Sequence, residues 1–392
     1  MKKVLILVCL FMVGCGQEIS DEIPSDAYIT IDNSNIEVFS DIYVSDIVSD
    51  TNVDIEDYKL NTDVIGDKEI EFYYTFDGKK YIYRTNIEVV DTVKPKIFGS
   101  ASKTVEVGYD GDLCNGYTYG DNYDGQPICS VEGEVDYNTA GTYDIDIVVT
   151  DVSGNSTNHH VTLNVVEEIR SNNNNSGGGG TSSKLAFSDA YARYKSDNTE
   201  LGIDVSEWQG DVNYEAVKEA GATFVMMRVG VKLSSGEEPA LDGEFINNIK
   251  NAKEAGLKVG VYLYSKALST KEAIEEAEWV LEQLDGESLD LPIVFDWEIW
   301  SNWNSYHMSF HDLNEMAEEF IKTVEDAGYE GMLYGSKFYL ENFWEDENYE
   351  NIWLAHYASS TSYEGYKIWQ FSNVGRINGI YGDVDLNVMV VD

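Results

Sequence analysis

The fold of the longest part of this chain is decided by residues 259–298, VGVYLYSKALSTKEAIEEAEWVLEQLDGESLDLPIVFDWE. Two short apolar runs, Val259–Tyr264 and Ile293–Phe295, flank a helical stretch at Lys271–Leu284. This is a strand–helix–strand unit. Strands that alternate with helices predict a parallel sheet with the helices outside it.

The same alternation continues on both sides of this unit. A second helical stretch is expected at Asp312–Ala327, and five further strand candidates are Gly202–Val205, Phe224–Val229, Gly331–Tyr334, Ile352–Ala355 and Tyr366–Gln370. From Leu201 to the end there are 392 − 200 = 192 residues, which is few for a full eight-fold barrel of about 250. The sequence therefore predicts a reduced barrel, with a short helix within Leu185–Glu200 leading into it.

Acidic residues stand where the strands of this barrel end. The first strand ends in Asp204, and the fourth is followed by Asp296 and Glu298. Functional side chains of β/α barrels lie at the C-terminal strand ends. Because side chains alternate along a strand, Asp296 and Glu298 point the same way, with about 6–7 Å between their backbones. Such a pair can divide the acid role from the nucleophile or stabiliser role in glycosidic cleavage, but metal sites and buried ion pairs also use such pairs.

All eight tryptophans lie after residue 200: Trp208, Trp279, Trp297, Trp300, Trp303, Trp344, Trp353 and Trp369. A large apolar ring packs on the C–H face of a sugar, so a cleft with several rings suits a polysaccharide. The alternative is core or loop packing, which we expect for roughly half of them. Trp279, on a helix, is the clearest case.

Seven motifs follow one another in the barrel region: Leu201–Gly210, Phe224–Gly230, Ala255–Tyr262, Phe295–Glu298, Trp353–Tyr357, Ile368–Gln370 and Gly382–Asn387. In order and content they resemble the glycoside hydrolase family 25 muramidases. The resemblance implies a flattened (β/α)5(β)3 barrel that cleaves the β-1,4 bond between N-acetylmuramic acid and N-acetylglucosamine in peptidoglycan. No cofactor or metal is expected, because acid–base chemistry with two carboxyl groups suffices. The chain departs from the family at Asn213-Tyr214, where Asp-Trp is frequent, and this concerns a peripheral contact.

The resemblance also assigns roles. Glu298 matches the proton donor, whose pKa should be raised by burial or by neighbouring carboxylates. Asp296 matches the second carboxylate, which either attacks the anomeric carbon or steadies the substrate's N-acetyl group while that group attacks. Asp204 and Asp385 match acidic positions of the same cleft, and Arg228 is expected to balance their charge. The strand-end residues expected in the sugar cleft, with barrel packing as the alternative, are Tyr264, Tyr334, Tyr357, Trp369 and Gln370.

Residues 31–166 have the two-residue period of strands, clearest at Lys68–Phe72 and Thr142–Ile147. Two parts of this region resemble each other: Ile36-Glu37-Val38 resembles Val105-Glu106-Val107, and Ile87–Asp91 resembles Leu163–Glu167. Two copies of one unit therefore follow each other. We predict two small all-β sandwiches, at residues 31–93 and 94–167.

The second unit resembles the bacterial immunoglobulin-like repeats of surface proteins at Asp121–Gly125, Ala140–Tyr143 and Thr150–Asn155, and the first unit does so less specifically. The resemblance implies spacers, with a wall- or sugar-binding role as the alternative. Asp121, Asn122 and Asp124 leave calcium open, although Asx-rich turns are common without it. Residues 168–184, rich in Asn, Gly and Ser, are expected to be a flexible linker to a catalytic domain at residues 185–392.

The cysteines and the N-terminus indicate export. Residues 1–15 have two lysines and then an apolar run that is short for a membrane-spanning helix of about 20 residues. Met12–Cys15 resembles the lipobox of bacterial lipoproteins, which implies removal of residues 1–14, a lipid on Cys15 and a tether at residues 15–30. Cys114 and Cys129 then remain outside the cytosol, where a disulfide could add about 3 kcal/mol of stability. Two free thiols or a metal site are the alternatives.

Charge excludes one class of function. Asp and Glu total 71 against 26 Lys and Arg, a formal net charge of −45, which argues against a sequence-independent nucleic-acid binder. Together with these resemblances, the sequence predicts two small all-β immunoglobulin-like sandwiches followed by an α/β reduced TIM-like (β/α)5(β)3 barrel. We expect a monomer, lipid-anchored on the outer face of the bacterial cell membrane, that acts on peptidoglycan glycan strands. A non-catalytic wall-binding lipoprotein and a hydrolase of another amino-sugar polymer are the alternatives.

Overall fold

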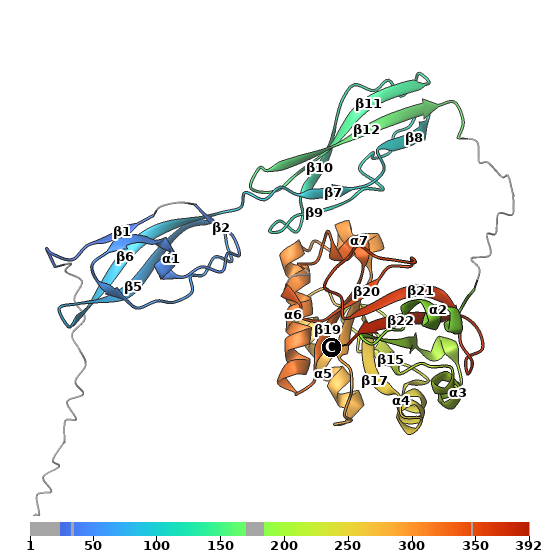
Figure 1. Cartoon of the computed structure of the whole chain (residues 1–392). Coiled ribbons are helices and arrows are strands. Elements are labelled where there is room, and N and C mark those ends of the chain that lie inside the picture. The colour runs from blue at the N-terminus through green and yellow to red at the C-terminus, as the bar shows by residue number, and fades with distance from the viewer. Residues whose placement is uncertain (1–23, 33–34, 170–183, 346–347, 392) are drawn as a thin grey trace, which may run out of the picture. The chain divides into compact units, whose positions relative to one another are not determined.

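The computed structural model describes residues 24–32, 35–169, 184–345 and 348–391 (Figure 1). The expected signal, the lipidation site Cys15 and most of the expected linker lie outside the described residues. The chain divides into two compact units, Met1–Val93 and Lys94–Asp392. Among the described residues, no helix is both long and apolar enough to cross a membrane.

The first unit is built on a long hairpin of β5 (Gly66–Phe76) and β6 (Lys79–Val90). The turn consists of Asp77 and Gly78, which both have positive φ, as a tight hairpin turn requires. Phe72 and Tyr74 are two residues apart and fully buried. The hairpin joins β2 (Ile36–Glu37) and β4 (Asp54–Ile55) in one sheet, and β1 (Ile29–Ile31) pairs with β3 (Val48–Thr51) beside the single helical turn α1 (Val44–Ile47).

Residues 96–166 form a domain that we call the second β-domain. Its four-stranded sheet has the order β10-β11-β12-β8, and a separate pair is formed by β7 and β9. The bounds are β7 (Lys96–Phe98), β8 (Ser102–Glu106), β9 (Thr118–Gly120), β10 (Ile128–Glu132), β11 (Gly141–Thr150) and β12 (Ser156–Val166). Its core contains Ile145, Ile147, Val161 and Leu163, each almost fully buried.

The structure pairs the repeated sequence motifs in the same way in both copies. Ile36 and Glu37 of β2 lie in parallel register with Val89 and Val90 of β6. Val105 and Glu106 of β8 lie in parallel register with Val165 and Val166 of β12. The two segments that look alike in sequence therefore meet inside each copy, which explains why both recur.

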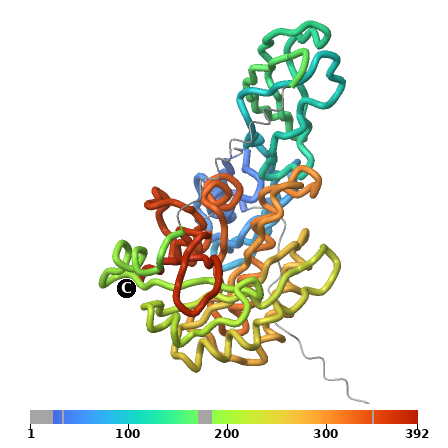
Figure 2. Tube along the Cα trace, turned by 90° about the vertical axis from the view of Figure 1, so that its right-hand side faces the viewer, coloured from blue at the N-terminus to red at the C-terminus, as the bar shows by residue number. Residues whose placement is uncertain are grey.

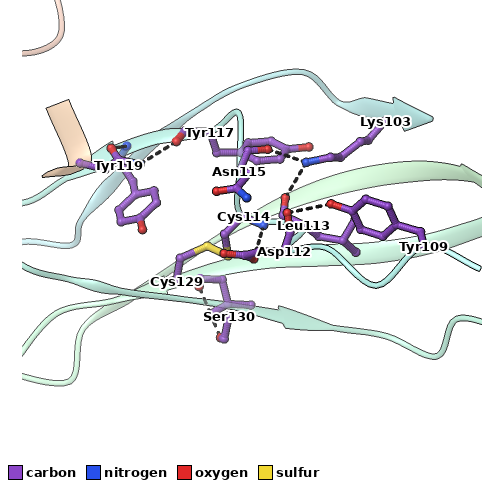
Figure 3. Close-up of a disulfide and its surroundings, with 12 residues drawn as sticks. Lys103, Tyr109, Asp112, Leu113, Cys114, Asn115, Tyr117, Tyr119, Cys129 and Ser130 are labelled. Carbon is purple, nitrogen blue, oxygen red and sulfur yellow. Dashed lines mark hydrogen bonds between the residues drawn. A yellow bond between two sulfur atoms is a disulfide. The ribbon is translucent and has the colours of Figure 1, made fainter. Parts of the chain in front are cut away.

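Cys114 and Cys129 form a disulfide, with their Cα atoms 6.3 Å apart (Figure 3). The bond ties the loop before β9 to β10. Three hydrogen bonds hold the same loop: Lys103 Nζ donates to the carbonyl oxygens of Leu113 and Asn115, and Tyr109 Oη donates to that of Asp112.

Eight strands of the C-terminal region form a closed ring in the order β14-β15-β17-β18-β19-β20-β21-β22, with β22 pairing back to β14. Their bounds are β14 (Thr199–Val205), β15 (Phe224–Val231), β17 (Lys258–Ser265), β18 (Ile293–Trp297), β19 (Gly331–Ser336), β20 (Ile352–Ala355), β21 (Ile368–Arg376) and β22 (Val384–Val390). All neighbours are parallel except β22, which is antiparallel to both β14 and β21. The seven predicted strands are confirmed, and β22 is an eighth that the prediction lacked.

Helices follow the first five strands of the ring. They are α3 (Tyr214–Glu219), α4 (Phe245–Glu254), α5 (Thr270–Leu284), α6 (Phe310–Asp326) and α7 (Lys337–Leu340). Before the ring, β13 (Leu185–Ala186) pairs with β21 and leads into α2 (Phe187–Tyr194), and the smaller elements are η1 (Glu207–Gln209), β16 (Ala240–Leu241) and η2 (Trp300–Ser305). Figure 2 shows the helical segments on the outside of this region.

Local sequence sets where the two longest helices begin. The Ser269 side chain accepts a hydrogen bond from the backbone of Glu272 at the start of α5. At the start of α6, Ser309 and Asp312 form a reciprocal capping box. Inside the ring, Gly202 packs against Phe224, where a Cβ atom would come within 2.4 Å of the Phe224 carbonyl oxygen. Glycine is therefore required for β14 and β15 to lie this close.

Candidate active site

Four acidic side chains meet at one end of the barrel. Asp204 lies near the C-terminal end of β14, Asp296 lies in β18, and Glu298 follows the last residue of β18. Asp385 is on β22, directly opposite Asp204 in the antiparallel register. Because β22 runs against the other strands, its beginning lies where their C-terminal ends lie, and this brings Asp385 to the same end.

Asp204 is held by two amide side chains. Its Oδ2 atom accepts hydrogen bonds from Asn387 Nδ2 at 2.7 Å and from Gln370 Nε2 at 2.9 Å. Gln370 Nε2 also lies 3.4 Å from Asp385 Oδ2. Asp204 is 6% exposed and Asn387 is fully buried, so these bonds replace the water that a buried carboxylate needs.

Aromatic side chains orient both amides. The hydroxyl groups of Tyr334 and Tyr357 donate to Gln370 Oε1 at 3.1 and 3.0 Å. Trp353 Nε1 donates to Asn387 Oδ1 at 2.9 Å. With its oxygen occupied in this way, each amide presents its NH₂ group to Asp204. The network therefore favours the ionised form of Asp204.

The pKa values of Asp204 and Asp385 are raised to different extents. Burial raises the pKa of Asp204 to about 6, opposed by the hydrogen bonds from Asn387, Gln370 and Asp385. The pKa of Asp385 rises to about 9 through burial, the charge of Asp204 and its hydrogen bond to Asp204. At neutral pH, Asp204 is therefore mainly ionised and Asp385 keeps its proton.

Asp296 and Glu298 form a second acidic pair. Asp296 is 5% exposed, and its pKa is raised well above the ordinary value by burial and by the charges of Glu298 and Asp204. Glu298 is solvent-exposed, yet its pKa is also raised, first by partial desolvation and then by the charge of Asp204, against a hydrogen bond with Asp296. The two groups titrate as a pair that keeps a proton above the usual carboxyl range.

Arg228, which we expect to balance the charge of Asp204 and Asp385, has its ion pairs with two other carboxylates. Its guanidinium pairs with Asp242 at 2.8 Å and with Glu207 at 3.2 Å. Asp242 is buried, and one of its oxygens also accepts from the backbone of Glu207. The positive charge of Arg228 opposes the rise in the pKa of Asp296, but less strongly than burial and the charges of Glu298 and Asp204 raise it.

Of the five residues expected in the sugar cleft, four lie with the carboxylates and one does not. Tyr264 stands beside Asp296 in the register of β17 and β18, and its pKa rises to about 12 through burial and the charges of Asp296 and Glu298. Tyr334, Tyr357 and Gln370 belong to the network around Asp204. Trp369 is 4% exposed, donates to the His356 carbonyl oxygen and packs against Tyr194 and Phe371.

The position of Trp369 corrects our prediction, and strand geometry gives the reason. Gln370 follows Trp369 on β21, and consecutive side chains of a strand point to opposite faces. Because Gln370 points into the barrel, Trp369 points into the outer layer. Six of the eight tryptophans are buried, more than the half expected to serve packing, and Trp208, at 80% exposure, is the exposed one among them.

The prediction missed three residues of the site. Asn387 and Trp353 complete the network around Asp204, and Tyr262 faces Trp353 with 5.7 Å between the ring centroids. The pKa of Tyr262 is raised well above its ordinary value by burial and by Asp204 and Asp296. The sequence did contain one indication of Asn387: it lies two residues after Asp385 and so shares its strand face.

Two other expectations have structural outcomes. At the departure from the family pattern, Asn213 caps α3 by accepting from the Ala216 backbone, and Tyr214 is buried. In the turn considered for calcium, Asp121 Oδ1 accepts from the backbones of Tyr123 and Asp124, and Asp124 accepts from those of Gln126 and Val152. These bonds give both carboxylates a role in the turn itself.

Comparisons with known proteins agree with this geometry. Residues 203–380 match glycosyl hydrolases family 25. YegX, an uncharacterized protein of Escherichia coli K12, is 30% identical over 194 residues, which are 48% of this chain and 68% of that protein. The autolytic lysozyme of Clostridium acetobutylicum is 29% identical over 192 residues, which are 47% of this chain and 54% of that protein. The chain belongs to glycosyl hydrolases family 25.

The matched region spans about half the length of the autolytic lysozyme. Among solved structures, the spore cortex lytic enzyme SleM of Clostridium perfringens is 22% identical, with a TM-score of 0.43, over 50% of this chain and 68% of that chain.

Proposed function

We propose that the barrel hydrolyses the β-1,4 bond between N-acetylmuramic acid and N-acetylglucosamine in peptidoglycan. The observation that carries the proposal is the acidic pair at the end of β18, where Asp296 and Glu298 both have raised pKa values beside the hydrogen-bonded Asp204. Membership of family 25 and the similarity to a protein named as an autolytic lysozyme support it.

Glu298 serves as the proton donor. It is the exposed member of the pair, so its carboxyl group can reach the glycosidic oxygen. Proton transfer to this oxygen lets the bond to the anomeric carbon break, and the oxygen leaves as a hydroxyl group. The anomeric carbon then takes an electron pair from a nucleophile, and water completes the hydrolysis.

Asp296 is the second carboxylate. In its ionised form it either supplies the electron pair itself or steadies the N-acetyl group of the substrate, whose oxygen supplies the pair instead. In both cases Asp296 must be ionised while Glu298 holds the proton. The free pair shares protons, and positive charge developing at the anomeric carbon favours the ionised Asp296 beneath it.

We extend the proposal to the whole chain as an exported, lipid-anchored cell-surface enzyme. The basic and apolar residues 1–13 and the lipobox-like Met12–Cys15 support export and a lipid on Cys15. The Cys114–Cys129 disulfide is in keeping with a location outside the cytosol. Immunoglobulin-like character of the two β regions is part of the same proposal.

The test uses purified peptidoglycan with the full chain, as wild type and as Glu298→Gln. New reducing ends are reduced with borohydride and identified by mass spectrometry. We expect reduced muramic acid ends from the wild type and a loss of at least about 1,000-fold in rate for Glu298→Gln. Reduced glucosamine ends would show that the enzyme cleaves a different glycosidic bond of the glycan strand. Binding without any release of ends would instead favour a non-catalytic wall-binding protein.

A further inference from the structure

The segment that follows Glu298 lies between the barrel and the second β-domain. This segment, residues 299–309, contains η2 and leads into α6. On the barrel side, the Trp300 ring stacks on Tyr339 with 3.8 Å between centroids and meets Trp297 edge to face. Trp297 separates Asp296 from Glu298 and is fully buried. The position of Glu298 therefore depends on where this segment is held.

On its other side, the segment completes the outer edge of β9. Asn304 Nδ2 donates to the Tyr117 carbonyl oxygen at 2.8 Å, and Asn304 Oδ1 accepts from the Tyr119 backbone at 3.1 Å. Trp303 Nε1 donates to the Tyr119 carbonyl oxygen at 3.0 Å. Three hydrogen bonds thus satisfy backbone groups of a short edge strand that would otherwise need water.

The second β-domain also supplies partners for the start of α6. The first amide groups of a helix have no acceptor within it. Here the Phe310 amide donates to the Asp121 carbonyl oxygen at 2.7 Å, and the His311 amide donates to that of Asn122 at 3.3 Å. The side chain of the cap residue, Ser309, accepts a hydrogen bond from the Asp312 amide. The two domains therefore share the N-terminal capping of one helix.

Close packing accompanies these hydrogen bonds. A Cβ atom on Gly120 would come within 2.8 Å of the Phe310 ring and 2.9 Å of Trp303 Nε1, and one on Gly125 would come within 2.6 Å of the His307 carbonyl oxygen. Phe98 packs on Phe338 and Phe343, with centroids 5.2 and 5.1 Å apart.

We infer that the second β-domain is a positioning element of the active site, which holds the 299–309 segment and thereby keeps Glu298 in place beside Asp296. Such a role goes beyond the spacer that the resemblance implies and beyond its alternative, a wall- or sugar-binding module. The inference rests on the proposed function for its kinetic part. The contact itself can be measured independently of activity, so the two can fail separately.

The test compares Gly120→Val with Gly141→Val in the full chain. Gly120 has no room for a side chain, whereas a Cβ atom on Gly141, on β11 of the same domain, meets its nearest atom only at 3.5 Å. Hydrogen exchange of the Phe310 and His311 amides reports the contact without using activity. We expect Gly120→Val to lose their protection and Gly141→Val to keep it.

The kinetic readout separates positioning from simple stability. With Gly120→Val we expect kcat on peptidoglycan to fall at least about tenfold, with KM changed less than about threefold. A released Glu298 gains water and moves away from Asp204, so its pKa falls. The alkaline limb of the pH–rate profile should therefore shift to lower pH, which a uniformly destabilised enzyme would not show.

Asn304→Ala and Asn304→Asp provide a second route if Gly120→Val fails to fold. Asn304→Ala removes the hydrogen bonds to Tyr117 and Tyr119, and Asn304→Asp replaces the donor by a carboxylate oxygen that faces the Tyr117 carbonyl oxygen, so both variants should lose protection. Protection of the two amides that survives in Gly120→Val and Asn304→Ala would overturn the inference. The inference would also be overturned if Gly120→Val lost the protection of these amides while its kcat and the alkaline limb of its pH–rate profile stayed unchanged. If the wild type is inactive on peptidoglycan but its amides are protected, the proposed function fails while the contact stands.

Discussion

The carboxyl groups of the site differ in protonation because their surroundings differ. Asp204 receives two amide donors and is ionised near neutral pH, whereas its cross-strand neighbour Asp385 has a pKa of about 9 and acts as a donor. The acidic residues at the strand ends were predictable because carboxyl groups in apolar strands stand out. The division of protons among them was not, because it depends on Asn387, Gln370 and Trp353, which only the closed barrel brings together.

Asp385→Asn should stabilise the protein at neutral pH and keep most of its activity. The pKa of Asp385 is about 9 in the folded chain, against an ordinary aspartate value of 3.8. Below about pH 4 the carboxyl group of Asp385 holds its proton in both the folded and the unfolded chain, so it has no effect on stability. Above that, the unfolded chain releases its proton while the folded chain keeps it, so stability falls as the pH rises towards 9. Asparagine removes this loss and still offers an NH₂ donor to Asp204.

Melting temperatures of wild type and Asp385→Asn between pH 4 and 9 test this. The difference should be near zero at pH 4 and grow with pH. Asp383→Asn is the matched control, because Asp383 is an exposed neighbour whose pKa is lowered, chiefly by its hydrogen bond to Lys184. A difference for Asp385→Asn that does not grow with pH would contradict the assignment of the proton to Asp385.

At the scale of elements, apolar runs gave the strands of the barrel because both faces of such strands are buried. The strand that the prediction missed is β22. Its apolar run is interrupted by Asp385 and Asn387, and these polar residues belong to the site. The role of η2 was not predictable. It rests on contacts between residues far apart in the sequence, such as Asn304 and Tyr117, which are 187 positions apart, and a contact of this kind leaves no periodic pattern in a sequence.

The start of α6 gives a prediction about this element. Ser309 Oγ accepts from the Asp312 backbone at 3.0 Å, and the Ser309 backbone donates to Asp312 Oδ2 at 2.8 Å. Ser309→Ala should lower the free energy of unfolding by about 1 kcal/mol, while Ser309→Thr, which keeps the cap, should lower it much less. Urea unfolding followed by tryptophan fluorescence measures both. Equal losses for the two variants would show that the hydroxyl group does not cap the helix.

For the whole molecule, the second β-domain and the barrel behave as one unit from Lys94 onwards. Sequence reasoning separated them because composition changes at the Asn/Gly/Ser stretch between them. A linker in the sequence shows only that the chain can be flexible at that point. Whether two domains touch depends on their surfaces, here an edge strand, two glycines and a helix start. The formal net charge of −45 adds general self-repulsion that specific contacts of this kind must overcome.

The disulfide links the stability of the second β-domain to the active site. Cys114 lies four residues before β9, whose edge holds the 299–309 segment. Closing this loop is worth about 3 kcal/mol, so the Cys114→Ser/Cys129→Ser double variant should unfold the second β-domain at a lower temperature than wild type. Between the temperature at which the second β-domain of the double variant melts and the temperature at which that of the wild type melts, the Phe310 and His311 amides of the variant should lose protection. Peptidoglycan hydrolysis by the variant should decline over the same interval. Ser130→Ala, beside Cys129 on β10, is the control and should leave both the amide protection and the hydrolysis unchanged. Full activity in that interval, with the β-domain melted by circular dichroism, would show that the barrel works without its partner domain.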